Sequence, residues 1–186
     1  MVYKVTGTIL AIVVVLVFLM PKQVVELPVD QSIASEEDFL SGDWSIIATT
    51  FPMWLKGDKR CPGLHYRLIE KGRWSDLVSY ETSQGEEYIK GVDTQSLGSP
   101  AKITWRGSGW LFFVTSDWAI SARGKHWMII AFDATWFTPR GVDVLSDGSQ
   151  LSQEDWRAID AVMKGDRYLN ALWPLLRPLD RSKCDP

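Results

Sequence analysis

The stretch SGDWSIIATTF, residues 41–51, decides the fold class. On an extended chain Trp44, Ile46 and Ala48 share one face, and polar or β-branched side chains alternate with them. This period of two predicts a strand that is buried on at least one side. A tryptophan at the first position of such a strand either plugs one end of a closed β-structure or covers the edge of a sheet. The remainder of the chain has to distinguish these two roles.

Seven further short runs with strand character follow, and turn residues separate them. They lie at 63–72, 74–85, 86–95, 101–107, 110–121, 126–138 and 141–148. Regular short strands at hairpin distance predict an antiparallel meander of eight strands that closes as a sandwich or a barrel.

One helix is predicted after the strands. Ser152 and Asp155 have the spacing of a capping box, which satisfies free amide groups at a helix start. Trp156, Ile159 and Met163 then form an apolar stripe at helical spacing. We interpret this stripe as a face that packs against the β-structure, and we expect the tail that follows to lie over the outside.

The beginning of the chain is typical of a membrane segment. Residues 5–20 carry no charge and follow Lys4. As a helix this run rises about 24 Å, somewhat less than the hydrocarbon core of a bilayer. By the positive-inside rule the rest of the chain is exported. We therefore divide the chain into a membrane anchor or signal segment (1–22), a stalk or linker (23–40) and a folded domain with a C-terminal helix and tail (41–186).

A retained anchor and a cleaved signal peptide are both consistent with this run. No small-x-small cleavage pattern follows it closely, and SIAS at 32–35 is the nearest one. We favour the anchor, which makes the protein single-pass with its domain on the periplasmic, lumenal or extracellular side. Cleavage would make it a secreted protein.

Composition excludes several functions. The 186 residues carry a net charge of -3 with scattered basic residues, so we predict no nucleic-acid binding. Only His65 and His126 are present, far apart, so we predict no metal site and expect both to be satisfied polar residues. Ten tryptophans indicate a broad apolar interior or a cavity lined by aromatic rings.

The sequence shows no recognisable catalytic motif. It contains no Gly-x-Ser-x-Gly, no Cys-x-x-Cys and no glycine loop followed by a phosphate-binding lysine. We therefore predict a binding protein without catalytic residues or cofactor. Asp117 and Asp133, which lie next to aromatic residues, are the candidates should the protein be an enzyme.

The ordered motifs together resemble the lipocalin family of the calycin superfamily, as an outlying member near its bacterial and apolipoprotein-D-like branch. Gly42 and Trp44 match the first motif, and EYIKGVDT (87–94) is similar to a later strand that commonly carries Gly-x-Ala. WMIIAFDATW (127–136), with Asp133, is similar to the second motif. VDVLSDGSQLSQEDW (142–156) is similar to the third motif and the helix start.

Two departures from the family pattern stand out. The third motif usually supplies an arginine that packs over the first-strand tryptophan, and Asp147 occupies that position here. The pairing is either absent or made from elsewhere, with Arg140 as the candidate. The chain between the second and third motifs is also short, so one hairpin is truncated or residues 116–121 carry the true second motif.

The resemblance implies an eight-stranded up-and-down β-barrel with one C-terminal α-helix, preceded here by the N-terminal transmembrane helix. Trp44 would close one end and leave the other open, and such a barrel holds one small ligand. The implied function is binding or transport of a small hydrophobic ligand, such as a fatty acid or lysophospholipid, at the outer face of a membrane. We predict that the following residues line the site: Ile46, Tyr66, Leu68, Tyr80, Trp105, Phe112 and Met128.

Two alternatives to a carrier remain open. Tryptophan side chains could fill the barrel, and the protein would then act as an interaction or envelope-maintenance module. It could also be a lipocalin-like enzyme. A void of several hundred cubic ångströms favours the carrier, and a filled interior favours the module.

The resemblance also implies a disulfide between Cys61 and Cys184. Several lipocalins tie the tail after the helix to the start of the second strand, and both cysteines match those positions. An exported chain with two cysteines at such extremities is consistent with this pairing. The alternative is two free thiols in a reducing compartment.

Overall fold

The computed structural model of the protein describes residues 26–30, 32–33, 38–96, 99–136, 138–148 and 150–184. The predicted membrane segment at 5–20 lies outside the described residues. Within the described ranges, no helix combines the length and the apolar character needed to span a bilayer.

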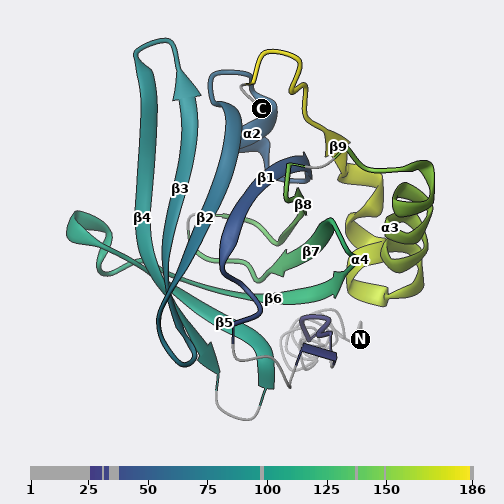
Figure 1. Ribbon diagram of the computed structural model, residues 1–186, viewed down its shortest axis with the longest axis horizontal. Helices are drawn as coiled ribbons and strands as arrows, with labels where there is room; N and C mark the ends of the chain where they lie inside the picture. Colours follow the sequence, from purple (N-terminus) through teal and green to yellow (C-terminus); the bar gives the residue numbers. More distant parts are fainter. Residues whose placement is uncertain are drawn as a thin grey trace, which may run out of the picture.

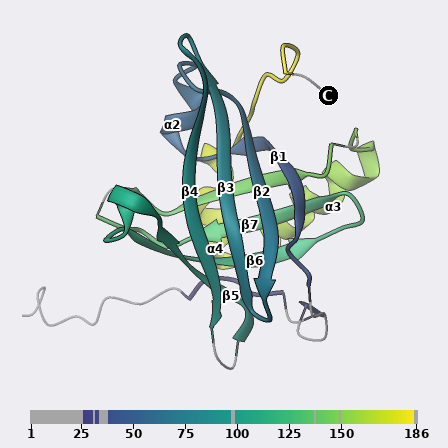
Figure 2. The same cartoon turned by 60° about the vertical axis from the view of Figure 1, so that its left-hand side comes forward.

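Eight antiparallel strands close into a barrel, as predicted (Figures 1 and 2). Each strand pairs with its neighbours in sequence, and the first strand pairs with both the second and the eighth. The strands are β1 (Gly42–Thr49), β2 (Arg60–Glu70), β3 (Arg73–Thr82), β4 (Gly85–Ser96), β5 (Ser99–Gly107), β6 (Thr115–Arg123), β7 (Trp127–Phe132) and β8 (Gly141–Ser146).

The sixth strand begins later than predicted. A 3-10 helix, η2 (Gly109–Leu111), occupies the start of the apolar run that we assigned to the strand at 110–121. Gly109 has a φ of 62°, in the left-handed region that favours glycine. The turn also folds so closely onto Gly107 that a Cβ there would lie 2.5 Å from the Leu111 carbonyl oxygen. These two glycines therefore direct the chain into a loop before β6 can start.

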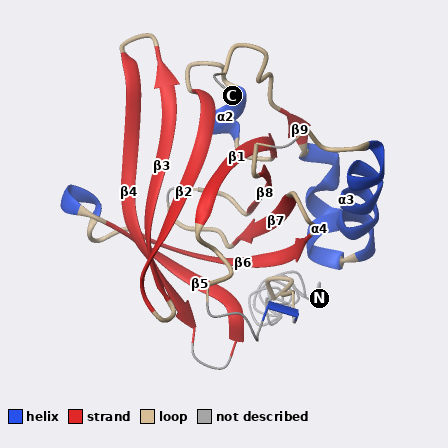
Figure 3. Ribbon diagram, in the orientation of Figure 1, coloured by secondary structure: helices blue, strands red, loops and turns tan. Residues whose placement is uncertain are grey.

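The chain after β8 is more structured than the predicted single helix and tail. Ser152 and Asp155 form the predicted capping box of α3 (Gln153–Gly165). Asp166 then caps a second helix, α4 (Arg167–Leu172), by accepting hydrogen bonds from two amide groups of its first turn. After η3 (Trp173–Leu175), a two-residue strand, β9 (Arg177–Pro178), pairs with β1. Figure 3 shows both helices on one side of the barrel.

The strands separate two apolar clusters. One lies between the outer face of the barrel and the helices, where Ile159 and Met163 of α3 pack with Ile129 and Val144. The other fills part of the barrel interior and includes Trp118. Apolar residues of the later strands therefore alternate between the barrel interior and the helix side, which explains why those stretches of sequence are continuously hydrophobic.

The N-terminal part of the domain helps to close one barrel end. Trp44 is half-buried and donates a hydrogen bond from its indole nitrogen to the Leu40 carbonyl at 3.3 Å. Ile33, Phe39 and Leu40 are buried in the interior cluster. We assigned these residues to a stalk, and here they form part of the core. The closed end therefore depends on them as well as on Trp44.

Arg140 does not take the predicted place over Trp44. Its guanidinium lies 5.2 Å from the centre of the Tyr168 ring on α4, and its Nε is 3.8 Å from the Asp133 carboxylate. Because Arg140 directly precedes β8, it lies at the opposite end of the barrel from Trp44. Of the alternatives that the sequence left open, the one that placed Arg140 over Trp44 was therefore wrong.

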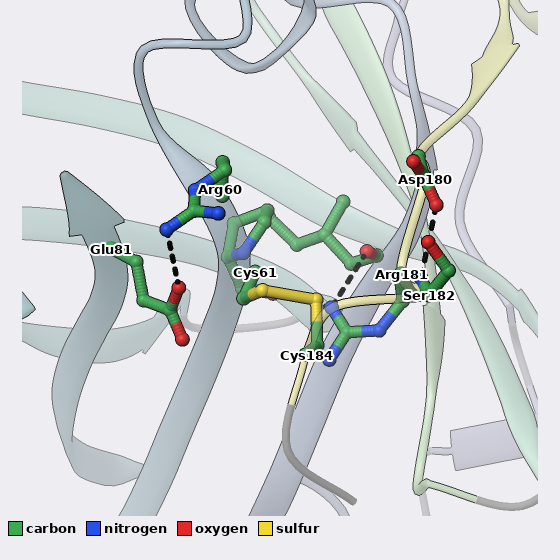
Figure 4. The surroundings of a disulfide bond; sticks show 9 residues. Arg60, Cys61, Glu81, Asp180, Arg181, Ser182 and Cys184 are labelled. Carbon is green, nitrogen blue, oxygen red and sulfur yellow. Dashed lines mark hydrogen bonds and ion pairs between the residues drawn. A yellow bond between two sulfur atoms is a disulfide. The ribbon is translucent and has the colours of Figure 1, made fainter. Parts of the chain in front are cut away.

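The predicted disulfide is confirmed. Cys61 and Cys184 are bonded, with their Cα atoms 5.5 Å apart across a sequence separation of 123 residues. Figure 4 shows Arg181 beside the bond. Its guanidinium donates to the carbonyl oxygens of Ile46 and Pro62. The end of the chain is thus fastened to the beginning of β2 by a covalent bond and to two strands by hydrogen bonds.

Candidate ligand cavity

A cavity lies inside the barrel at the end opposite the N-terminal closure. Its volume is about 190 Å³. Three connections contribute to its wall: the β1–β2 connection with its short helix α2 (Pro52–Leu55), the β5–β6 connection and the β7–β8 connection. From the strands, side chains of Ile46, Leu64, Tyr66, Asp76, Val78, Ile89, Trp105, Ser116, Trp118, Phe132 and Asp143 line it. The cavity is therefore smaller than the several hundred cubic ångströms that would favour a carrier, but side chains do not fill the barrel interior completely.

Aromatic rings form one wall of this cavity. Tyr66 stacks on Trp118 with ring centres 6.0 Å apart, and Trp118 lies 6.0 Å from Phe132. Phe51 meets Phe132 edge-on at 5.3 Å. Such pairs hold one another in place beyond the effect of burial alone. The wall is consequently a preformed apolar surface.

A glycine on β4 makes room for another aromatic ring of the cavity wall, that of Trp105 on β5. A Cβ at Gly91 would lie 2.1 Å from the indole nitrogen of Trp105. Only glycine allows the Trp105 ring to approach β4 so closely, and this is the glycine that matched the Gly-x-Ala pattern of the family. The strand register pairs Gly91 with Asp76, so the Trp105 ring is brought toward that carboxyl.

Three carboxyl groups are buried inside the barrel. Asp76, Asp93 and Asp143 are 6%, 0% and 3% exposed. Asp93 accepts a hydrogen bond from the Trp118 indole nitrogen at 2.8 Å, and Asp143 accepts one from the Thr49 hydroxyl at 2.5 Å. Asp76 Oδ1 and Asp93 Oδ2 have no hydrogen-bond partner. Trp105 lies near enough to favour the Asp76 anion, although its N–H makes no hydrogen bond of normal geometry.

Burial dominates the ionisation of these groups. It raises the pKa of Asp93 and of Asp143 to about 7. Burial, together with the charge of Asp93, raises the pKa of Asp76 well above its usual value. Burial and the three carboxyl groups likewise raise the pKa of Tyr66. The described lining residues include no lysine, arginine or histidine that could neutralise the carboxylates.

The predicted lining residues fall into three groups. Ile46, Tyr66 and Trp105 line the cavity. Met128 is buried in the interior cluster outside the cavity wall, and Tyr80 packs against Trp54 at 5.7 Å. Leu68, near the closed end, and Phe112, in the β5–β6 loop, are exposed and are not among the lining residues described.

Sequence reasoning missed the carboxyl groups on the cavity wall. Trp74, Asp76 and Val78 alternate along β3, and Trp74 and Val78 both belong to the interior cluster or pack against it. The alternation was therefore a usable signal that Asp76 faces inward. Asp143 lay within the quoted third motif without being selected.

The other polar residues that we singled out make structural contacts. His65 lies between Asp43 at 2.7 Å and Ser79 at 2.8 Å, and His126 pairs with Asp147 at 2.9 Å. The expectation that both histidines are satisfied polar residues is confirmed.

The two candidate catalytic carboxylates also have structural partners. Asp117 is exposed and accepts a hydrogen bond from the Thr104 hydroxyl at 2.7 Å. Asp133 lies beside Arg140. Neither residue lines the cavity as described.

Comparison with known proteins identifies the fold. No family model and no curated protein matches the sequence. Among solved structures, insecticyanin from the tobacco hornworm Manduca sexta has a TM-score of 0.62 at 18% identity, covering 85% of this chain and 86% of that chain. The siderocalin Ex-FABP has a TM-score of 0.56 at 13% identity, with coverage of 77% and 95%. The bovine lipocalin allergen Bos d 2 has a TM-score of 0.52 at 11% identity, with coverage of 78% and 95%.

The closed antiparallel barrel with an open cavity and a helix on its outer face defines a calycin-type β-barrel. More particularly, the fold is that of the lipocalins. The prediction of this fold is confirmed, and the placement near the bacterial and apolipoprotein-D-like branch stays a prediction.

Proposed function

We propose that the protein binds and carries a small hydrophobic ligand in its barrel cavity. The observation that carries this proposal is the preformed aromatic cavity of about 190 Å³, reached past three loops at one barrel end. Apolar pockets with a few convergent polar groups are typical ligand sites. The similarity to a siderocalin that functions through dual ligand specificities supports the same function. We retain a fatty acid or lysophospholipid, with its chain in the cavity and its head group at the mouth, as the first class to test.

We further propose that the mouth of the barrel operates at the outer face of a membrane. The loops at the mouth expose large aromatic side chains, with Trp110 78% and Trp136 99% exposed. Phe112 and Phe113 are exposed beside Trp110. Tryptophan is enriched where proteins meet the membrane–water boundary. The apolar run at 5–20 would hold the chain there, and the disulfide fits an oxidising, exported compartment.

A cavity-filling variant tests the carrier function. We expect a fatty acid or lysophospholipid, added below its micelle concentration, to change the tryptophan emission of the full chain in nanodiscs. Val78→Trp should weaken this binding by more than about tenfold, because a bulky ring occupies the space that the ligand needs. Ile69→Trp adds the same ring at an exposed position and should bind like the unmodified protein. Equal binding by both variants, or no ligand signal and no copurified lipid by mass spectrometry, would refute the cavity as the site.

A lipid-borne quencher tests the orientation of the mouth. In vesicles that contain brominated lipid, we expect the double variant Trp110→Ser, Trp136→Ser to lose about half or more of the quenchable tryptophan emission, because both rings should lie in the interfacial region. Trp156→Ser, on α3 away from the mouth, should leave the quenching nearly unchanged. Similar quenching in all three proteins would mean that the mouth does not face the bilayer.

A further inference from the structure

We propose that the cavity selects a hydrophobic ligand that bears a positively charged nitrogen, an amine or quaternary ammonium, with Asp76 as the group that faces the cation. This inference rests on the proposed carrier function and narrows its ligand class by charge. Its basis is the set of buried carboxyl groups, which the carrier function itself does not require.

Asp76 has the geometry of a ligand-binding group. Its side chain lines the cavity and is 6% exposed, and its Oδ1 atom has no hydrogen-bond partner. A buried polar atom without a partner is destabilising, and natural proteins keep such atoms mainly where a ligand or water completes them. Gly91 lies opposite Asp76 in the strand register, and the Trp105 indole packs over Gly91 beside the carboxyl. Its N–H makes no hydrogen bond of normal geometry, so a ligand placed between them could contact Asp76 Oδ1.

The charge balance of the cavity favours a cation over an anion. Asp143 lines the same cavity, and Asp93 accepts a hydrogen bond from the indole of Trp118, which also lines it. The lining residues that the structure describes contribute no positive charge. Above about pH 7, where Asp143 ionises, a carboxylate placed inside would meet a like charge in a region of low dielectric constant. An ammonium group would meet an opposite charge and would itself lower the pKa of the carboxyl group that it contacts. We therefore expect a fatty acid to enter by its alkyl chain.

The aromatic walls suit the same ligand class. Trp105 and Trp118 line the cavity, and Tyr66 stacks on Trp118. Faces of indole and phenol rings attract organic cations, most strongly where water is excluded. The apolar surface would bind the hydrophobic body of the ligand.

A metal ion fits these residues less well. In the described part of the chain, no three or more histidine, cysteine, aspartate or glutamate side chains are grouped so that they could hold a metal. Hard cations such as calcium require six or more oxygen ligands, and most of this wall is carbon. The counter-charge is thus best supplied by an organic cation.

Isosteric ligands provide the test. Three water-soluble compounds share one short alkyl chain and end in a trimethylammonium group, the uncharged tert-butyl group of the same shape, or a carboxylate. Calorimetric titration would use the full chain in nanodiscs, with empty nanodiscs subtracted. At about pH 8, where Asp143 is ionised, we expect the ammonium compound to bind about ten- to a hundredfold more tightly than the tert-butyl compound. The preference comes from charge attraction alone, because a trimethylammonium group has no N–H to donate. The carboxylate should bind most weakly.

Matched variants assign the effect to Asp76. Asp76→Asn should abolish the preference for the ammonium compound while leaving tert-butyl binding nearly unchanged. Asp117→Asn removes an exposed carboxylate outside the cavity and should retain the preference. Circular dichroism of each variant would establish that it is folded, and Asp143→Asn is the second cavity variant should Asp76→Asn not fold.

The outcomes separate this inference from the carrier function. Equal binding of the ammonium and tert-butyl compounds would overturn the inference and leave the carrier function intact. Retention of the preference in a folded Asp76→Asn protein would overturn the assignment to Asp76. Failure of all three compounds and of every lipid to bind would remove both proposals.

Discussion

Replacing Cys61 and Cys184 together by serine is expected to lower the free energy of unfolding by about 4–5 kcal/mol. The disulfide closes a loop of 123 residues, and without it the unfolded chain gains the corresponding conformational freedom. The value is an upper bound if the unfolded chain remains compact. Denaturant unfolding of the oxidised, reduced and doubly substituted proteins measures the effect.

The reduced protein and the serine variant serve as mutual controls. They should unfold at the same denaturant concentration, and both should unfold well below the oxidised protein. Non-reducing mass spectrometry of protein from its native compartment should find no thiol that can be alkylated. Two freely alkylated thiols, or equal stability of all three proteins, would contradict a stabilising bridge and weaken the argument for export.

A second large effect is expected from Asp143→Asn, which should stabilise the folded protein by roughly 4 kcal/mol at about pH 8. Burial raises the pKa of Asp143 to about 7, well above its value of 3.8 in an unfolded chain. Between these two pH values the folded state holds a proton that the unfolded state has lost, so stability falls as the pH rises. Asparagine carries no charge and still offers an oxygen to the Thr49 hydroxyl.

Urea unfolding across the pH range measures this difference. The gain from Asp143→Asn should be small below about pH 4 and reach its full size above about pH 7. Carboxyl groups with lowered pKa, such as Asp43 hydrogen-bonded to Arg67, act in the opposite direction and only at more acidic pH. Asp117→Asn, at an exposed position, should show little gain. A gain that is absent or independent of pH would mean that the Asp143 carboxyl is not ionised at a cost to folding.

The barrel was predictable from the sequence because its strands alternate with a period of two. Trp44, Ile46 and Ala48 already define this pattern, and the paired strands keep it through the chain. The limits of the later strands were less predictable. The run at 110–114 has the composition of a buried strand, but the backbone freedom of Gly109 places it in a loop.

The closed end and the site depended on tertiary context. Residues 23–40 contain five acidic residues and one proline, a composition often found in linkers. Ile33, Phe39 and Leu40 are nevertheless buried, because the barrel end needs an apolar cover. We did not include Asp76 among the predicted lining residues, because a carboxyl group is ordinarily expected on the solvent face of a strand. The disulfide followed from the resemblance to the lipocalins, since the presence of two cysteines does not by itself show whether they are bonded or free.

The closed strand order has a consequence for how the protein behaves at high concentration. Each of the eight barrel strands pairs on both sides along at least part of its length, and β9 covers a further part of β1. An open sheet would present a free edge on which another chain could add a strand. The described barrel therefore offers little free strand edge at which two molecules could associate by strand addition. Association between molecules should instead begin at the solvent-exposed indole rings of Trp110 and Trp136.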